Sequence, residues 1–336
     1  MASEQSWAAS ESLAPAPSGY DLRPLSTGEI LDRTFQLYRS HFALFASLAA
    51  LPAAVRFLTG VLQLLLLPRA QTLRNGQHVL AGRWPLISVG SSILFLLVYF
   101  VFYGITQAAT TWAVAEIYLG RAASVRAAWR AAMARWFRYV LVTLRQYWSI
   151  GWWPLLSFAV FGIAVTLIPG RGRDAGVFLG VIAFLLGLQI FASFIYAIWA
   201  ALKVSLAVPA SVIESLGANA AVRRSIGLLP ERKGRIFLLG LLVYAMTIVV
   251  SMVLLPLAFI ALRAHGVERY LLQMLQLIGS FFSSMLVGPV AAIALCLFYF
   301  DERVRHEGFD VEFLMLRAGG IPAAPVAEDI RSPEPG

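Results

Sequence analysis

Residues 86–120 read LISVGSSILFLLVYFVFYGITQAATTWAVAEIYLG, and Glu116 is the one charged residue among them. About 20 predominantly apolar residues are enough for a helix to cross the hydrocarbon core of a bilayer. Backbone N–H and C=O groups find no water at that depth, so a run of this kind must be helical to satisfy them internally. The stretch therefore predicts a transmembrane α-helix.

The composition of the whole chain agrees with this local pattern. Of its 336 residues, 59% are hydrophobic and 13% are charged, and the mean hydropathy is +0.75. A typical soluble domain is about 45–50% apolar and about 25% charged. The composition excludes an ordinary water-soluble globular protein and predicts an all-α membrane protein that crosses the bilayer several times.

Six apolar runs are long enough to be transmembrane helices. They lie at residues 42–67, 86–120, 149–169, 175–202, 236–262 and 271–300. The ends of the chain differ from these runs, because residues 1–24 and 318–336 are rich in Ala, Ser, Gly and Pro, which favours disorder. We therefore expect one helical membrane domain at residues 25–317 between two disordered tails.

The distribution of positive charge predicts the orientation of the domain. Nineteen of the 27 Lys and Arg residues fall on the side that carries both termini, seven fall on the opposite side, and Arg56 lies within the first run. Cytoplasmic loops of membrane proteins carry an excess of Lys and Arg. We therefore expect both termini in the cytoplasm, and we attribute the net charge of +9 to membrane orientation rather than to nucleic-acid binding.

Short amphipathic segments precede the first, third and fifth runs. Ser26 and Glu29 have the spacing of a capping box, which predicts a helix start. Apolar residues recur at helical spacing from Val125 to Leu144, with arginines on other faces, as in a basic helix that lies at the membrane interface. A third such segment covers residues 218–229. His41, Arg138 and Arg235 each precede an apolar run and are spaced 97 residues apart, which favours a threefold internal repeat.

Four charged residues are candidates for a functional role within the membrane or at its boundary. Glu116, Glu214 and Asp301 each close a returning run, and Arg56 lies inside the first run. Two interpretations are open for the three acids: a ring of carboxylates on a cation or proton path, or structural pairing with nearby basic residues. Arg56 either serves function at membrane depth or extends towards the interface as a structural residue.

The polar residues within the runs are also open to two interpretations. Gln107 and Thr111 lie in the second run, Gln189 in the fourth, and Gln273 and Gln276 in the sixth. Such groups either bind a transported solute or form hydrogen bonds between helices.

The basic interfacial segments predict contacts with anionic lipid headgroups. Each Lys or Arg near an anionic leaflet contributes about 1 kcal/mol of attraction. The candidate contacts are Arg126, Arg130, Arg138, Arg145, Arg223 and Arg224.

The sequence contains no motif that indicates catalysis. Its four histidines lie in four different segments, Cys296 is the one cysteine, and HExxH, Walker A, GxSxG and CxxC motifs are absent. We therefore expect no enzymatic activity, no cofactor and no metal site.

Three stretches together resemble a bacterial family named for the membrane domain of glycerophosphoryl diester phosphodiesterases. The first runs from Pro24 to Phe35, the second covers residues 208–225, and the third is FYFDERVRHEGFD at residues 298–310. The resemblance covers residues 22–315 and implies a helical bundle in the bacterial plasma membrane. The catalytic domain of those enzymes is a soluble barrel with a His-Arg-Gly type motif, which this chain lacks, so the resemblance carries over no catalytic residue.

These observations lead to two hypotheses for function. The first is a non-enzymatic accessory or scaffold protein of the plasma membrane that contacts the bilayer, anionic lipid headgroups and a membrane protein partner. The alternative is a transporter or channel for a small solute, with Arg56, Glu116, Glu214 and Asp301 near the path.

Overall fold

The computed structural model describes residues 24–72, 84–167, 175–228, 233–264 and 266–308. The regular secondary structure of these residues is helical. The helices are α1 (Thr27–Ser40), α2 (Phe42–Thr72), α3 (Trp84–Tyr118), α4 (Val125–Met133), α5 (Trp136–Leu167), α6 (Ala175–Val204), α7 (Ala207–Ile213), α8 (Ala218–Leu228), α9 (Lys233–Arg263) and α10 (Val267–Glu307). The predicted disordered tails fall outside the described residues, apart from Pro24.

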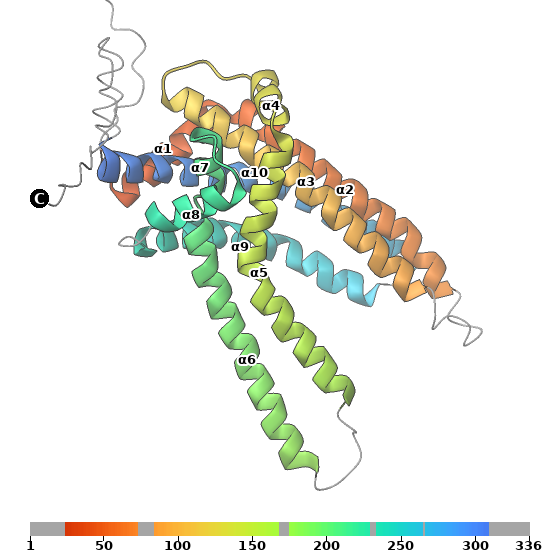
Figure 1. Cartoon of the computed structure of the whole chain (residues 1–336). Coiled ribbons are helices and arrows are strands. Elements are labelled where there is room, and N and C mark those ends of the chain that lie inside the picture. The colour runs from red at the N-terminus through yellow and green to blue at the C-terminus, as the bar shows by residue number, and fades with distance from the viewer. Residues whose placement is uncertain (1–23, 73–83, 168–174, 229–232, 265, 309–336) are drawn as a thin grey trace, which may run out of the picture.

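The short and long helices occupy different parts of the molecule. The short helices α1, α4, α7 and α8 gather at one end, and the long helices α2, α3, α5, α6, α9 and α10 run away from it as three hairpins (Figure 1). We call this the short-helix end, and the opposite end of the long helices the far end. The described chain both begins and ends at the short-helix end, because the backbone N–H of Leu25 donates to Asp301 Oδ1 over 2.7 Å.

Five stretches of helix are long and apolar enough to cross a membrane. They are Phe42–Leu65, Gly90–Tyr118, Phe184–Ile213, Gly234–Arg263 and Val267–Glu307. Helix α5 has 32 residues, but Arg138, Arg145 and Gln146 lie in its first half and reduce its hydropathy. The chain is therefore an all-helical protein with the character of a multi-pass membrane protein.

The predicted capping box is present at the start of α1. The side chain of Ser26 accepts from the backbone N–H of Glu29, and the Glu29 carboxylate accepts from the backbone N–H of Ser26. This reciprocal pairing satisfies two donors that a helix start would otherwise leave without partners. Leu25 and Ile30, which flank the box, are both buried in the same core.

The segment from Val125 to Leu144 is not one helix, which corrects the sequence prediction. Helix α4 ends at Met133 and α5 begins at Trp136, so the third long helix starts before residue 149. The two-residue break changes which face packs inward: Ala128 and Ala132 are buried, whereas Met133 and Trp136 are exposed. The small alanine side chains allow α4 to lie close to α3.

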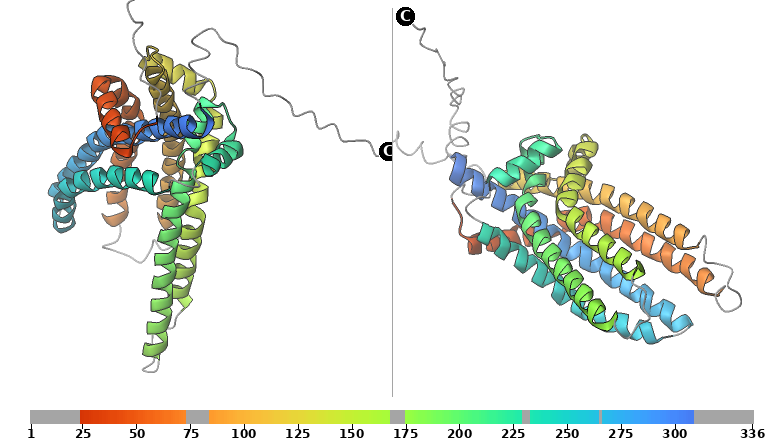
Figure 2. Two further views of the ribbon diagram at one scale, coloured as in Figure 1. Left: turned by 90° about the vertical axis from the view of Figure 1, so that its left-hand side faces the viewer. Right: turned by 60° about the horizontal axis from the view of Figure 1, so that its bottom comes forward.

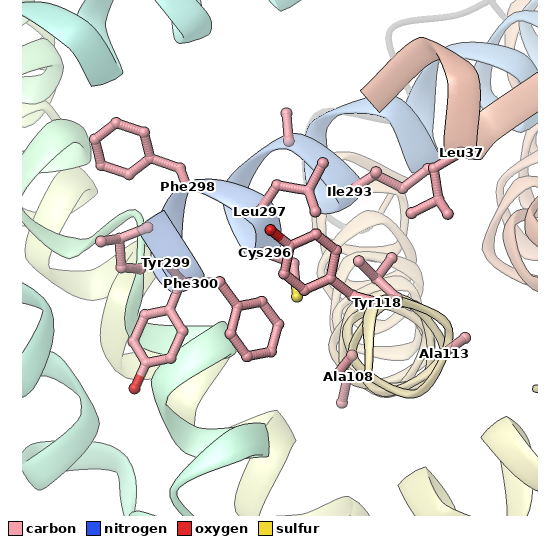
Figure 3. Close-up of a cluster of buried hydrophobic side chains, with 14 of the residues drawn as sticks. Leu37, Ala108, Ala113, Tyr118, Ile293, Cys296, Leu297, Phe298, Tyr299 and Phe300 are labelled. Atoms are coloured by element: carbon pink, nitrogen blue, oxygen red, sulfur yellow. The ribbon is translucent and has the colours of Figure 1, made fainter. Parts of the chain in front are cut away.

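The core of the short-helix end forms around the second half of α10. Every residue from Cys296 to Glu302 on α10 is buried. Ile293 and Leu297 lie near Leu37 of α1 and Ala108, Ala113 and Tyr118 of α3 (Figure 3). The Tyr118 ring stacks on Phe300, with 5.2 Å between the ring centroids. A packed apolar centre thus joins α1, α3 and α10.

The hairpin of α5 and α6 diverges from the other long helices towards the far end (Figure 2). Hydrogen bonds hold the two helices together: Gln189 donates to Ser157 over 3.1 Å, and Trp152 donates to Tyr196 over 2.8 Å. Phe158, Phe184 and other large apolar side chains of the hairpin are exposed. In a membrane these side chains would face lipid.

The buried alanine face of α4 generates the first prediction. Replacing Ala132 with Leu adds volume at a site that is 1% exposed, so we expect the free energy of unfolding to fall by about 1–3 kcal/mol. Met133→Leu is the matched control, because Met133 is exposed and the two side chains have similar volume. Thermal unfolding in mild detergent measures both variants, and equal midpoints would contradict the packing of α4.

Candidate functional site

A cluster of charged side chains joins α8 to the end of α10. We call it the Glu214 cluster: Glu214, Arg224, Tyr299, Arg303 and Glu307. The Arg224 guanidinium donates to both Glu214 carboxylate oxygens over 2.8–3.0 Å and also contacts Glu307. Tyr299 donates to Glu214 Oε1, and Arg303 donates to Glu307 over 3.0 Å. The charges of the two carboxylates and the two guanidinium groups cancel, so the cluster has no net charge.

A second cluster ties the start of the described chain to α10. We call it the Asp301 cluster: Leu25, Arg235, Asp301, Glu302 and Arg305. Asp301 contacts Arg235 over 2.9 Å and Arg305 over 3.0 Å, and Arg235 lies 3.5 Å from Glu302. The Leu25 carbonyl accepts from Arg235 over 2.7 Å and from Arg305 over 2.5 Å. The backbone of one residue before α1 is therefore bound by side chains of α9 and α10.

Burial makes these contacts energetically important. The side chains of Asp301 and Glu302 are fully buried, and those of their arginine partners are 20–23% exposed. The charged run at residues 301–305 is therefore not exposed to water at its two acids. Removing one partner of a buried ion pair costs about 3–5 kcal/mol because the other charge is left uncompensated.

Arg224 shows the same balance of burial and pairing. Burial lowers the pKa of the Arg224 guanidinium, but its hydrogen bonds to Glu214 and Glu307 outweigh that effect and raise the pKa above its ordinary value. Arg224 is thus held by two carboxylates rather than presented to the surroundings.

The three boundary acids do not meet at one point. Glu214 and Asp301 lie on two sides of the α10 end, whereas Glu116 on α3 pairs with Arg121 over 2.7 Å. Each of the three acids has an arginine partner, as the structural-pairing interpretation requires. Arg121 is 61% exposed, so the Glu116 pair is screened by water far more than the other two.

The six arginines proposed to contact lipid divide into two groups. Arg126 and Arg130 of α4 and Arg223 of α8 are exposed and form no ion pair with a described acid. Arg138 donates to the Ser215 carbonyl over 2.8 Å, Arg145 donates to Asn219 over 3.3 Å, and Arg224 belongs to the Glu214 cluster. The three exposed arginines are accessible to lipid headgroups. The other three bind residues at or beside the connection between α7 and α8.

Arg56 lies away from the charge clusters and lines a cavity of about 690 Å³ between α2, α9 and α10. Arg269, Gln273 and Gln276 of α10 line the same cavity. The structure therefore brings together Arg56 and the two glutamines that the sequence analysis singled out separately.

A smaller cavity of about 80 Å³ lies among α3, α5, α7 and α10. Gln107 and Thr111 of α3 line it together with Thr143 and Gln146 of α5. The Thr143 hydroxyl is buried and has no hydrogen-bond partner among the described residues. The cavity thus places one unsatisfied hydroxyl, that of Thr143, within the helical bundle.

Sequence analysis did not identify several members of the clusters. Arg303 and Glu307 are four residues apart, as are Asp301 and Arg305. This i,i+4 spacing on a helix could have predicted both ion pairs. Arg235 and the Leu25 backbone had no comparable signal, because they come from distant parts of the chain. Within the described residues, no group of three or more His, Cys, Asp or Glu side chains is placed to hold a metal ion.

Comparison of the chain with models of known protein families, with curated proteins and with solved structures found no match.

The Asp301 cluster generates the second prediction. Asp301→Asn leaves two arginines and the Leu25 N–H without their carboxylate, so we expect the free energy of unfolding to fall by about 3–5 kcal/mol. Glu116→Gln is the control, and its exposed pair predicts a loss of about 0–1 kcal/mol. Thermal unfolding in mild detergent measures both variants.

A double variant distinguishes loss of the Asp301–Arg305 ion pair from a general loss of stability. Arg305→Gln combined with Asp301→Asn removes one stranded charge, so the double variant should lose less stability than the sum of the single variants. Equal losses for Asp301→Asn and Glu116→Gln would contradict a structural role for this cluster.

Proposed function

We propose that the chain is a six-span, non-enzymatic integral membrane protein with an accessory or scaffold role, whose short-helix end forms a rigid cytoplasmic platform. The packed and charge-balanced centre of the short-helix end carries this proposal. Cys296 to Glu302 are buried there, and the ion pairs around them are internally neutral. Such a packed centre is suited to holding an attached partner in a fixed position.

Six spans and a threefold repeat are part of the proposal. Support comes from the order of helices, since a short helix precedes two long ones at α1–α3, α4–α6 and α8–α10. The length of α5 and the common location of both described chain ends also favour an even number of crossings. The excess of positive charge favours a cytoplasmic short-helix end.

The proposed membrane is the bacterial plasma membrane, and the basis for this is the sequence resemblance. Under this proposal the chain is a standalone counterpart of the membrane domain found in glycerophosphoryl diester phosphodiesterases. The exposed Arg126, Arg130 and Arg223 would contact anionic headgroups, because they lie on the helices nearest the proposed cytoplasmic surface.

A small-solute transporter is the second candidate. The cavity that contains Gln107, Thr111 and Thr143 favours it, because polar groups within a helical bundle can bind a solute. Its volume of about 80 Å³ and its position next to a packed core favour the accessory role over a continuous path.

Topology is tested with single cysteines in a Cys296→Ser background. We expect a membrane-impermeant thiol reagent to label Val267→Cys and Arg171→Cys from outside intact cells, and to label Ala122→Cys only after lysis. Labelling at position 171 tests whether α5 crosses the membrane. Protection at position 171 together with labelling at position 267 would contradict six spans.

The accessory role is tested by gentle extraction with a C-terminal tag and mass spectrometry of co-purifying proteins. We expect a protein partner in stoichiometric amount, and the same procedure applied to an unrelated six-span protein is the control. Solute flux into liposomes that contain the purified chain tests the transporter hypothesis. Solute flux that Thr143→Val abolishes without loss of folding, with no partner recovered, would replace the accessory role by transport.

A further inference from the structure

The cavity that contains Arg56 extends from the middle of α2 towards the far end. Arg56 is 14 residues from the start of α2, or about 20 Å along the helix axis. Gly266 and Arg269, at the start of α10, line the cavity from the turn that joins α9 to α10. Its volume of about 690 Å³ lies within the range of about 300–1,000 Å³ that is usual for small-molecule sites.

The charge that lines this cavity is positive. Arg56 and Arg269 are its charged lining residues, and no carboxylate is among them. Glu268 is exposed and is not part of the lining. Neither arginine forms an ion pair with a described acid. An unpaired cation at membrane depth is costly, so Arg56, which lies inside an apolar run, requires water or an anion as a partner. Arg269 is the third residue of α10 and lies at the far end of the bundle.

Neutral hydrogen-bond donors surround the two arginines. They are the side-chain amides of Gln63, Gln273 and Gln276. The hydroxyls of Ser251 and Ser280, which also line the cavity, donate to backbone carbonyls of their own helices. The start of α10 adds to them, because its N-cap residue Gly266 provides no side-chain cap and leaves first-turn N–H groups available. The N-terminal end of a helix also carries a partial positive charge that favours anions. The two arginines, the amide donors and the helix dipole all favour an anion in the cavity, and Glu268 in the first turn of α10 is the acid that opposes them.

One wall of the cavity is apolar. Leu64 of α2, Leu254 and Leu255 of α9 and Leu277 of α10 line it. Helix α9 has few buried residues and exposes Met252, Val253 and Leu255, so this wall borders the lipid-facing surface. A ligand that is anionic at one end and apolar at the other matches both walls.

We propose that this cavity binds the phosphate group of an anionic membrane lipid, with Arg56 and Arg269 as the charged ligands to the phosphate oxygens. The planar guanidinium group of arginine can donate two parallel hydrogen bonds to a phosphate. The glutamine amides complete the donor set, and the leucine wall accommodates the start of the acyl chains. This site is separate from the short-helix end and does not depend on the accessory role.

The lipid site is tested with the purified full-length chain taken from vesicles of phosphatidylcholine and phosphatidylglycerol. Native mass spectrometry counts the phosphatidylglycerol that stays bound. We expect Arg56→Gln and Arg269→Gln to lower that retention about tenfold or more, because a hydrogen bond to a charged group contributes about 1.5–3 kcal/mol. Arg263→Gln is the matched control, since Arg263 is exposed at the end of α9 and does not line the cavity.

Titration with inorganic phosphate by calorimetry distinguishes a lipid from a soluble ligand. Heat that is lost in Arg56→Gln and kept in Arg263→Gln would support the same phosphate site with a free anion as its ligand. Equal phosphatidylglycerol retention in all variants, with no phosphate heat, would overturn the proposal. Thermal unfolding confirms that the variants fold, and Gln273→Ala serves as a further test because it removes a donor without changing charge.

Discussion

The buried carboxylate of Asp301 is the constraint on which the arrangement of the short-helix end depends. It accepts from the Leu25 N–H and contacts Arg235 and Arg305 within 3.0 Å. Because a carboxylate buried without partners is several kcal/mol less favourable, these contacts must all form together. They fix the start of α1 and the start of α9 against the end of α10. The positions of the first and third hairpins follow from that attachment.

The two ends of the bundle are stabilised by different interactions. At the short-helix end, apolar packing around α10 and two neutral ion-pair clusters hold the helices together. Towards the far end, the hairpins depend on close approach and on hydrogen bonds between helices: a Cβ at Gly60 would overlap the side chain of Leu277, and Gln189 donates to Ser157. Lipid tails are as apolar as leucine, so burial of apolar surface adds little there.

The sequence was sufficient to predict the helices and insufficient to predict their contacts. Apolar runs and the Ser26–Glu29 spacing are local signals, and the helices and the capping box follow from them. The break between α4 and α5 falls at Ala134 and Arg135, where no proline or glycine indicates a helix end. The Asp301 cluster includes the backbone of Leu25, and every residue has the same backbone groups. The Arg56 cavity combines residues of three helices, which a linear pattern does not bring together.

The bond between Leu25 and Asp301 joins residues 276 positions apart in the chain. A ribosome adds roughly 5–20 residues per second, so Leu25 is added to the chain about 14–55 seconds before Asp301. Throughout that interval α1 lacks the carboxylate that anchors it. Closure of the short-helix end is therefore a late event in biogenesis, and the first hairpin must persist in the bilayer until the last helix has been delivered.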